Sequence, residues 1–194
     1  MLVQAVRQHS LSMLADSFLE KRAGLIPIHH LCSTLGELCI PLAGRRILAL
    51  RNSNVHVEDF DELMIELELC IGLIFKPLRH HLKNVVEEGH GVLLSLWTPV
   101  LQVLTEILSP PALGGKTSNT ESESPTSDKI FKATNDLAIE HLRNVIMVLI
   151  GYGVLVEGSS QSNDLTDLTW TFVGKIEVCK PFLDEWKKAA SQAS

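Results

Sequence analysis

Residues 60–85, FDELMIELELCIGLIFKPLRHHLKNV, decide the fold class of this chain. Large apolar residues recur there at steps of three and four: Phe60, Leu63, Leu67, Ile71, Ile74, Leu78, Leu82 and Val85. Such steps place side chains on one face of an α-helix, whereas a half-buried strand would alternate apolar and polar residues. The stretch therefore predicts a long amphipathic helix.

The same spacing continues on both sides of this stretch. It predicts further helices over 28–42, 93–107, 138–149 and 168–186, and a shorter one around Leu11, Leu14 and Phe18. Residues typical of helix ends and turns lie between the periodic runs, namely Gly44, Asn52 to Asn54, Gly89 and Gly151 to Gly153. The whole chain is therefore expected to be helical.

Four prolines fall inside or just within the periodic runs: Pro41, Pro77, Pro99 and Pro181. A proline removes one backbone hydrogen bond and bends or restarts a helix. Bent helix pairs stacked side by side are the building plan of HEAT and armadillo solenoids. We therefore predict an all-α fold of bent antiparallel helix pairs, stacked as a HEAT/armadillo-like solenoid fragment.

One stretch breaks the helical pattern. Residues 109–128 are rich in Ser, Thr, Pro, Gly and Glu and hold almost no large apolar residue, so they bury too little surface to offset the entropy of ordering. We expect a first helical stack over 1–108, a flexible loop over 109–128, and two last helices over 129–190 that pack on the same stack. The serines of this loop could accept phosphate, but a solvent loop tolerant of length changes is the simpler interpretation.

Charge and cysteine content exclude several classes of protein. The net charge of −6 and a pI near 5.7 give little general affinity for phosphate backbones, so nucleic acid is not an expected partner. The four cysteines, Cys32, Cys39, Cys70 and Cys179, are widely spread and three lie in apolar runs, which favours buried reduced thiols and a cytoplasmic protein.

Neither a secretory signal nor a membrane-spanning segment is expected. Residues 1–7 lack the basic region and apolar stretch of a secretory signal. The longest apolar run, 145–156, contains two glycines and is far shorter than the roughly 20 residues that span a bilayer.

Short motifs for nucleotide or metal binding fail on their spacing. Gly114 to Thr117 resembles the end of a phosphate-binding loop, but Pro110 replaces its first glycine and no strand precedes it. The pairs His29-His30 and His80-His81 lack a completing ligand cluster, and residues 52–58 resemble a calcium loop without its central glycine. We expect no catalytic residue, no metal and no cofactor.

Two groups of residues remain as candidates for contacts with partners. Arg45 and Arg46, and further along Lys76, Arg79 and Lys83, form basic patches that could attract anionic lipid headgroups, although solvated helix faces are the simpler interpretation. The three tryptophans, Trp97, Trp170 and Trp186, serve either as packing residues or as hot spots for a protein partner.

Five blocks in this order resemble a known family. They are Leu38-Cys39-Ile40-Pro41-Leu42, Ser95-Leu96-Trp97 with Val100 and Leu101, the helix Glu140 to Leu149, Leu168-Thr169-Trp170, and Cys179-Lys180-Pro181-Phe182-Leu183. Together they span about 150 residues and are similar to the C-terminal helical region of the large guanine-nucleotide exchange factors for Arf GTPases, of the Golgi brefeldin A-resistance type. Other branches of the family share similar helices.

The resemblance implies a part without the exchange activity of its parent. Such proteins exchange nucleotide through a SEC-seven domain, which nothing in this chain resembles, so no catalytic residue is carried over. The implied role is a scaffold and targeting module in Golgi vesicle traffic, located in the cytoplasm and peripherally at Golgi membranes. The implied partners are other domains of the exchange factor and Arf or Rab-type GTPases, with peripheral membrane contact as a further option.

Two other classes of function stay open at this point. The first is a free-standing HEAT-like adaptor for protein–protein interaction without a connection to Arf. The second is a helical enzyme with a site hidden between helices, for which a buried cluster of titratable groups in a cleft would be needed.

Overall fold

The computed structural model describes residues 27–52, 60–109, 125–156 and 163–193. Its elements are α2 (Ile28–Thr34), the π-helix η1 (Leu35–Cys39), α3 (Ile40–Arg51), α4 (Phe60–Glu88), α5 (His90–Ile107), α6 (Pro125–Gly151), α7 (Asn163–Lys175), the 3-10 helix η3 (Glu177–Cys179) and α8 (Lys180–Gln192). Every regular element in these ranges is a helix, which confirms the predicted all-α class. The helix expected around Leu11, Leu14 and Phe18 lies outside the described residues.

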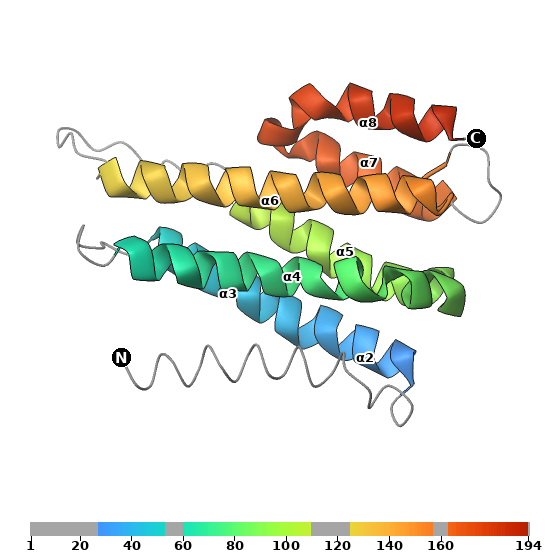
Figure 1. The fold of residues 1–194 in the computed structure, drawn as a ribbon, viewed down its shortest axis with the longest axis horizontal. Helices are drawn as coiled ribbons and strands as arrows, with labels where there is room; N and C mark the ends of the chain where they lie inside the picture. Colours follow the sequence, from blue (N-terminus) through green and yellow to red (C-terminus); the bar gives the residue numbers. More distant parts are fainter. Residues whose placement is uncertain (1–26, 53–59, 110–124, 157–162, 194) are drawn as a thin grey trace.

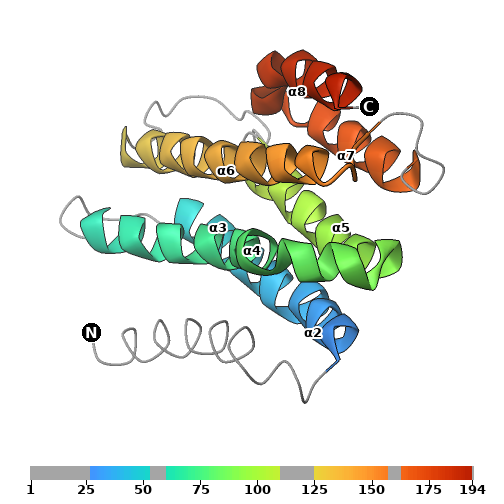
Figure 2. The ribbon, with the colours of Figure 1, turned by 45° about the vertical axis from the view of Figure 1, so that its right-hand side comes forward.

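The helices form two layers of a stack (Figures 1 and 2). The continuous run α2–η1–α3, then α5 and then α7 pack side by side in the first layer, while α4, α6 and α8 do so in the second. Chain direction reverses from each layer to the other, so α4 and α6 run the same way (Figure 1). This arrangement is the expected solenoid of antiparallel helix pairs.

Helix α5 lies at the centre of the core. It contacts α2, η1 and α3 on one side, α7 on the other, and α4 in the second layer. Its buried side chains point in all these directions, and they include Leu96, Trp97, Val100, Leu101 and Leu104, each with no exposed surface. The apolar residues at helical spacing over 93–107 are therefore buried in one helix, as predicted.

Two glycines bring the first run of the chain close to α5. A Cβ atom on Gly36 would lie 2.5 Å from the backbone oxygen of Ser95, and one on Gly44 would lie 2.5 Å from Cγ1 of Val103. The prediction that Gly44 separates two helices is wrong, since it lies inside α3. Its missing side chain serves the contact between helices rather than a helix end.

The expected helix over 168–186 is divided in two, which corrects that prediction. α7 ends at Lys175, and Ile176 adopts an extended conformation with φ −85° and ψ 109° before η3 and α8. Pro181 stands in the first turn of α8, where its missing N–H costs no helical hydrogen bond. Pro181 thus lies at the start of a new helix, α8, which folds back on α7.

Prolines mark two other irregular points. Pro41 lies in the first turn of α3, directly after η1, where the N–H of Ile40 donates to the carbonyl of Leu35 in the wider π-helical pattern. α6 begins at Pro125, so the last residues of the expected 109–128 loop are helical, with Asp128 in the first turn. Residues 110–124 lie outside the described part.

Candidate interaction surface

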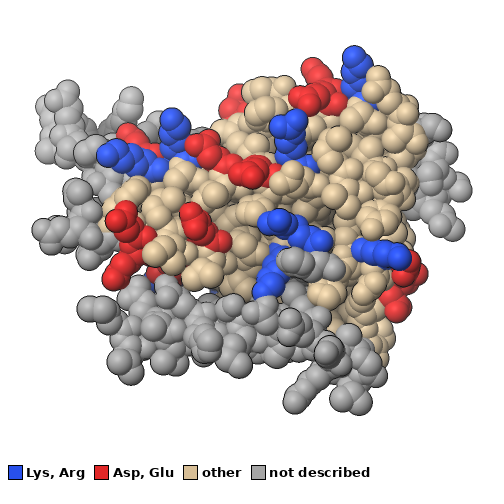
Figure 3. All heavy atoms as spheres, in the orientation of Figure 1, with Lys and Arg blue, Asp and Glu red and all other residues tan. Residues whose placement is uncertain are grey.

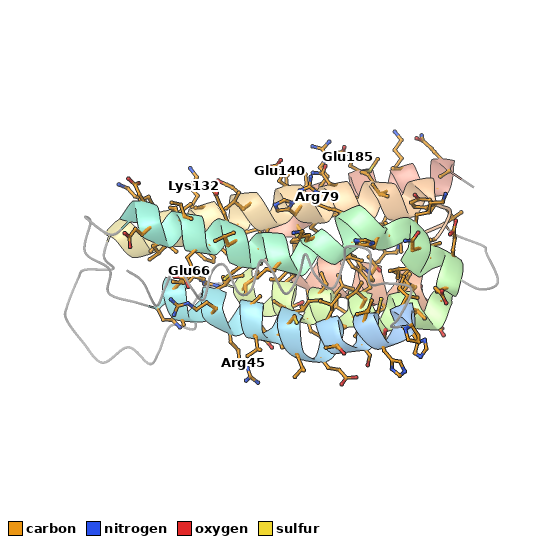
Figure 4. The ribbon with its side chains drawn as sticks, turned by 60° about the horizontal axis from the view of Figure 1, so that its bottom comes forward. Arg45, Glu66, Arg79, Lys132, Glu140 and Glu185 are labelled. Carbon is orange, nitrogen blue, oxygen red and sulfur yellow. The ribbon has the colours of Figure 1, made fainter. Side chains whose placement is uncertain are left out.

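The two arginines of α3 have different environments. Arg45 is exposed and points away from α4 (Figure 4). Arg46 forms a two-pronged ion pair with Glu66 of α4, with Nε 2.6 Å from Oε1 and Nη2 2.9 Å from Oε2. This hydrogen bonding raises the pKa of Arg46. Arg46 therefore holds α3 against α4, and its charge is largely matched within the chain.

The basic residues of α4 lie on a different side of the molecule. Arg79 and Lys83 are exposed, and Lys76 is partly buried. Lys83 lies 3.8 Å from Glu87, an exposed pair that contributes little to stability. Figure 4 shows Arg79 beside Glu140 of α6, far from Arg45, so the five basic residues do not form one site.

Acidic residues interrupt the basic ones across the second layer. Figure 3 shows Lys and Arg interspersed with Asp and Glu on the face that carries α4, α6 and α8. Arg143 of α6 lies 3.6 Å from Glu185 of α8 in one such exposed pair. A mixed surface of this kind suits a protein partner that carries complementary charges.

The tryptophans are mainly core residues. Trp97 and Trp186 have no exposed surface, so a partner cannot reach them and the hot-spot alternative does not apply to these two. Trp97 joins α5 to α7, because its Nε1 donates to Oγ1 of Thr169 at 2.8 Å and that hydroxyl donates to the carbonyl of Leu165 at 2.7 Å. Trp170 is partly buried.

Arg51 is a residue that sequence reasoning missed. Arg51 is 7% exposed, and its guanidinium donates to the backbone carbonyls of Ile107 and Ser109 at the end of α5 and also covers the ring of Phe131. A cation at a helix C-terminus satisfies carbonyls that have no partner in the helix. Helical spacing alone gives no sign of this contact, because it joins segments from three helices.

His141 links α4 and α6 through its ring. It stacks on Phe75 with ring centroids 5.3 Å apart, and its Nδ1 is buried without a hydrogen-bond partner among the described residues. Burial, and next the positive charge of Arg79, lower the pKa of His141, while Glu140 opposes the shift. The folded chain therefore holds this ring in its neutral form.

The lowered pKa of His141 predicts a loss of stability in mild acid. An unfolded histidine takes up a proton as the pH falls through about 6.5, whereas the folded ring does so only at lower pH. The unfolded state then binds more protons, so stability falls as the pH drops below about 6.5. Urea unfolding at pH 7.5 and 5.5 measures this loss of stability, which should be smaller in His141→Gln. An unchanged loss would contradict its assignment to the His141 ring.

The described residues show no grouping of His, Cys, Asp and Glu side chains that could hold a metal ion. Cys32, Cys70 and Cys179 are buried free thiols, as predicted, and Cys39 is partly exposed. Burial raises the pKa of Cys32, Cys70 and Cys179 to about 11, so the reactive thiolate form is rare. Within the described ranges, none of the helices has the length and apolar character to cross a bilayer.

A family comparison decides what this stack is. Residues 3–178 match the family described as GBF1-like, tetratrico peptide repeat region. The chain belongs to this family. The match confirms the resemblance to the brefeldin A-resistance type of exchange factor, and the chain is a helical repeat module of GBF1-like proteins. Searches of curated proteins and of solved structures gave no match.

The GBF1-like repeat region differs in proportion from ordinary tetratricopeptide units. A tetratricopeptide unit uses about 34 residues for two helices, whereas α4 alone has 29 residues and α6 has 27. The helix pairs are therefore closer in length to HEAT and armadillo units. Stacks of either kind mediate protein–protein interactions through extended surfaces.

Proposed function

We propose that this chain is a non-catalytic C-terminal scaffold and targeting module of an Arf guanine-nucleotide exchange factor in Golgi vesicle traffic. The match of residues 3–178 to the GBF1-like repeat region carries the proposal. The module acts by binding: it contacts other domains of the exchange factor and Arf or Rab-type GTPases, in the cytoplasm and at the surface of Golgi membranes.

The arrangement of side chains supports a binding role. Trp97, Trp186 and Arg51 are used in packing, and the exposed charges lie on helix faces. Among the exposed cations of the described residues, we assign Arg79 and Lys83 on α4 and Arg45 on α3 to the contact with an acidic partner or anionic lipid. A free-standing adaptor without an Arf connection would use the same surfaces, and the family match favours the exchange-factor module over it.

Co-sedimentation with liposomes tests the targeting role. The purified chain is mixed with anionic, Golgi-like vesicles, with and without GTP-loaded Arf, at two salt concentrations. We expect pelleting that either requires Arf or decreases at high salt, because contacts of exposed charges are screened within about a Debye length. Absence of pelleting in every condition would contradict the targeting role.

Charge reversal locates the contact. Arg79→Glu combined with Lys83→Glu should reduce pelleting if α4 makes the contact, and Arg45→Glu should do so if α3 does. The matched control combines Lys187→Glu with Lys188→Glu, two exposed lysines of α8 that give the same change in net charge. Equal loss in the control and the α4 variant would indicate a nonspecific charge effect and remove α4 from the proposal.

A nucleotide-exchange assay tests the absence of catalysis. Release of a fluorescent GDP analogue from Arf should proceed at the buffer rate when this chain is added alone. Acceleration above that background would contradict the non-catalytic part of the proposal, while leaving the pelleting result to decide on targeting.

A further inference from the structure

Arg51 is the only buried charged residue in the ranges that the structure describes. It ends α3, and both α3 and α5 end toward the side of the stack where α6 begins (Figure 1). Its guanidinium donates to the backbone oxygens of Ile107 and Ser109, and its Cζ lies 4.5 Å from the ring centroid of Phe131. One side chain thus connects α3 with the end of α5 and with α6.

The positive charge of Arg51 has no carboxylate partner among the described residues. Its contacts there are backbone oxygens and an aromatic ring, and burial lowers its pKa. Arg46, on the same helix, shows the contrast, because Glu66 neutralises it. Buried charges in proteins are ordinarily paired, and the guanidinium has further N–H donors besides those that the backbone oxygens use. An anion placed beside Arg51 would therefore be bound by charge-assisted hydrogen bonds.

Ser109 brings an exposed hydroxyl to this cation. The backbone oxygen of Ser109 is 3.2 Å from Nη2 of Arg51, and its Oγ donates to the backbone oxygen of Thr105. The residue is exposed, so the hydroxyl can be reached from solvent. Only a few bonds separate Oγ from the backbone oxygen of the same residue, so a phosphate on Oγ has oxygens within reach of the Arg51 guanidinium.

We propose that Ser109 is a phosphorylation site whose phosphate pairs with Arg51. A protein kinase transfers the γ-phosphoryl group of ATP: Oγ of Ser109 bonds to the γ-phosphorus, the bond from that phosphorus to ADP breaks, and the hydroxyl proton passes to the base of the kinase. The product places a charge of about −1.5 to −2 beside Arg51. The sequence supports the site independently, since Pro110 follows Ser109 and Ser-Pro is the dipeptide that proline-directed kinases recognise.

Arg51 decides whether this phosphate stabilises or weakens the fold. Ser109 lies just after α5, which ends at Ile107, and the free carbonyl groups at a helix C-terminus repel a negative charge. Glu106, which is exposed on the last turn of α5, repels it as well. The guanidinium opposes both effects through its hydrogen bonds to the phosphate. Phosphorylation therefore stabilises the contact between α3 and α5 only while residue 51 carries a positive charge.

Genetically encoded phosphoserine in the full chain tests the pairing. At position 109 we expect a melting temperature about 2–4 °C higher than in the unmodified chain, as one net stabilising contact gives a chain of this length. Phosphorus NMR should show the second pKa of the phosphate, ordinarily about 6, lowered by at least about 0.5 relative to a control position. The matched control is position 191.

Ser191 resembles Ser109 in everything except the buried arginine. It is exposed near the end of α8, and its Oγ donates to the backbone oxygen of Lys187 at 3.0 Å. Lys187 and Lys188 are exposed on the same turn, so the control does not lack positive charge. Equal changes in melting temperature and phosphate pKa at positions 109 and 191 overturn the proposal.

Arg51→Gln removes the charge and keeps an N–H donor for the backbone oxygens. In this variant we expect phosphoserine at position 109 to give no rise in melting temperature. The phosphorylated and unmodified forms of the same variant are compared, so the effect of Arg51→Gln itself cancels. A rise as large as in the chain with Arg51 overturns the proposal, and the comparison with position 191 decides it even if Arg51→Gln does not fold.

Treatment with a proline-directed kinase and ATP tests access to the hydroxyl of Ser109. Mass spectrometry of the peptides locates the phosphate, and Ser109→Ala is the control. We expect modification of Ser109 in the folded full chain. Its absence, under conditions in which the kinase modifies a short peptide of the same sequence, overturns the proposal. None of these measurements involves membranes or Arf, so their outcome is independent of the proposed function.

Discussion

Replacement of Trp97 by alanine is expected to lower the free energy of unfolding by about 3–5 kcal/mol. Trp97 has no exposed surface and lies in α5, which contacts helices of both layers. Its loss would leave a large cavity and would leave the hydroxyl of Thr169 without the indole donor at 2.8 Å. Urea unfolding followed by circular dichroism measures the effect.

Two controls separate packing from hydrogen bonding at Trp97. Thr169→Val keeps the volume but leaves the buried indole N–H without an acceptor, which should cost about 1–3 kcal/mol. Tyr152→Ala removes an aromatic ring that is 47% exposed and should change stability by no more than about 0.5 kcal/mol. A loss for Trp97→Ala as small as that of Tyr152→Ala would show that the α5–α7 contact is described wrongly.

Gly36→Ala is expected to destabilise the chain even though alanine favours helices. The added Cβ would lie 2.5 Å from the backbone oxygen of Ser95 and 3.2 Å from Cγ of Pro99, so α5 must move away from η1. Overpacking of this kind costs about 1–3 kcal/mol, which exceeds the roughly 0.5–1 kcal/mol that replacing a helical glycine gains. Thermal unfolding at fixed protein concentration measures the net effect.

Gly72→Ala is the matched control for Gly36→Ala. Gly72 also lies inside a helix, α4, but a Cβ on it would meet no atom within 4 Å. It should therefore raise the stability by about 0.5–1 kcal/mol. Opposite signs for the two variants are the expected result, and stabilisation by both would rule out the close contact between η1 and α5.

The sequence alone predicts most of the helices, but it does not predict the contacts between them. Apolar residues at steps of three and four predict α4 and α5, because one face of each helix is buried. The same rule joined α7 and α8 into one helix, since Ile176 and Cys179 keep the apolar spacing across the break at Ile176. Apolar spacing indicates which residues are buried. It does not reveal a turn between two helices when the residues of the turn are buried as well.

Contacts between distant segments explain the remaining differences. The sequence alone predicts that Gly44 ends a helix. The role of its small size is visible only in its contact with Val103, which lies 59 residues later. The sequence alone predicts that Arg46 belongs to a basic patch, because its partner Glu66 lies on another helix. Spacing places Lys76, Arg79 and Lys83 along one helix, but it does not predict that Glu140 of α6 lies beside Arg79.

The central place of α5 has a consequence for how the chain unfolds. In a repeat protein whose units touch only their neighbours, the ends can open while the rest stays folded. Here α5 contacts segments from Ile28 to Lys175, so opening either end removes part of its cover. Protease cleavage and hydrogen exchange should therefore report one cooperative transition across α2 to α7, with α8 alone free to detach at lower cost.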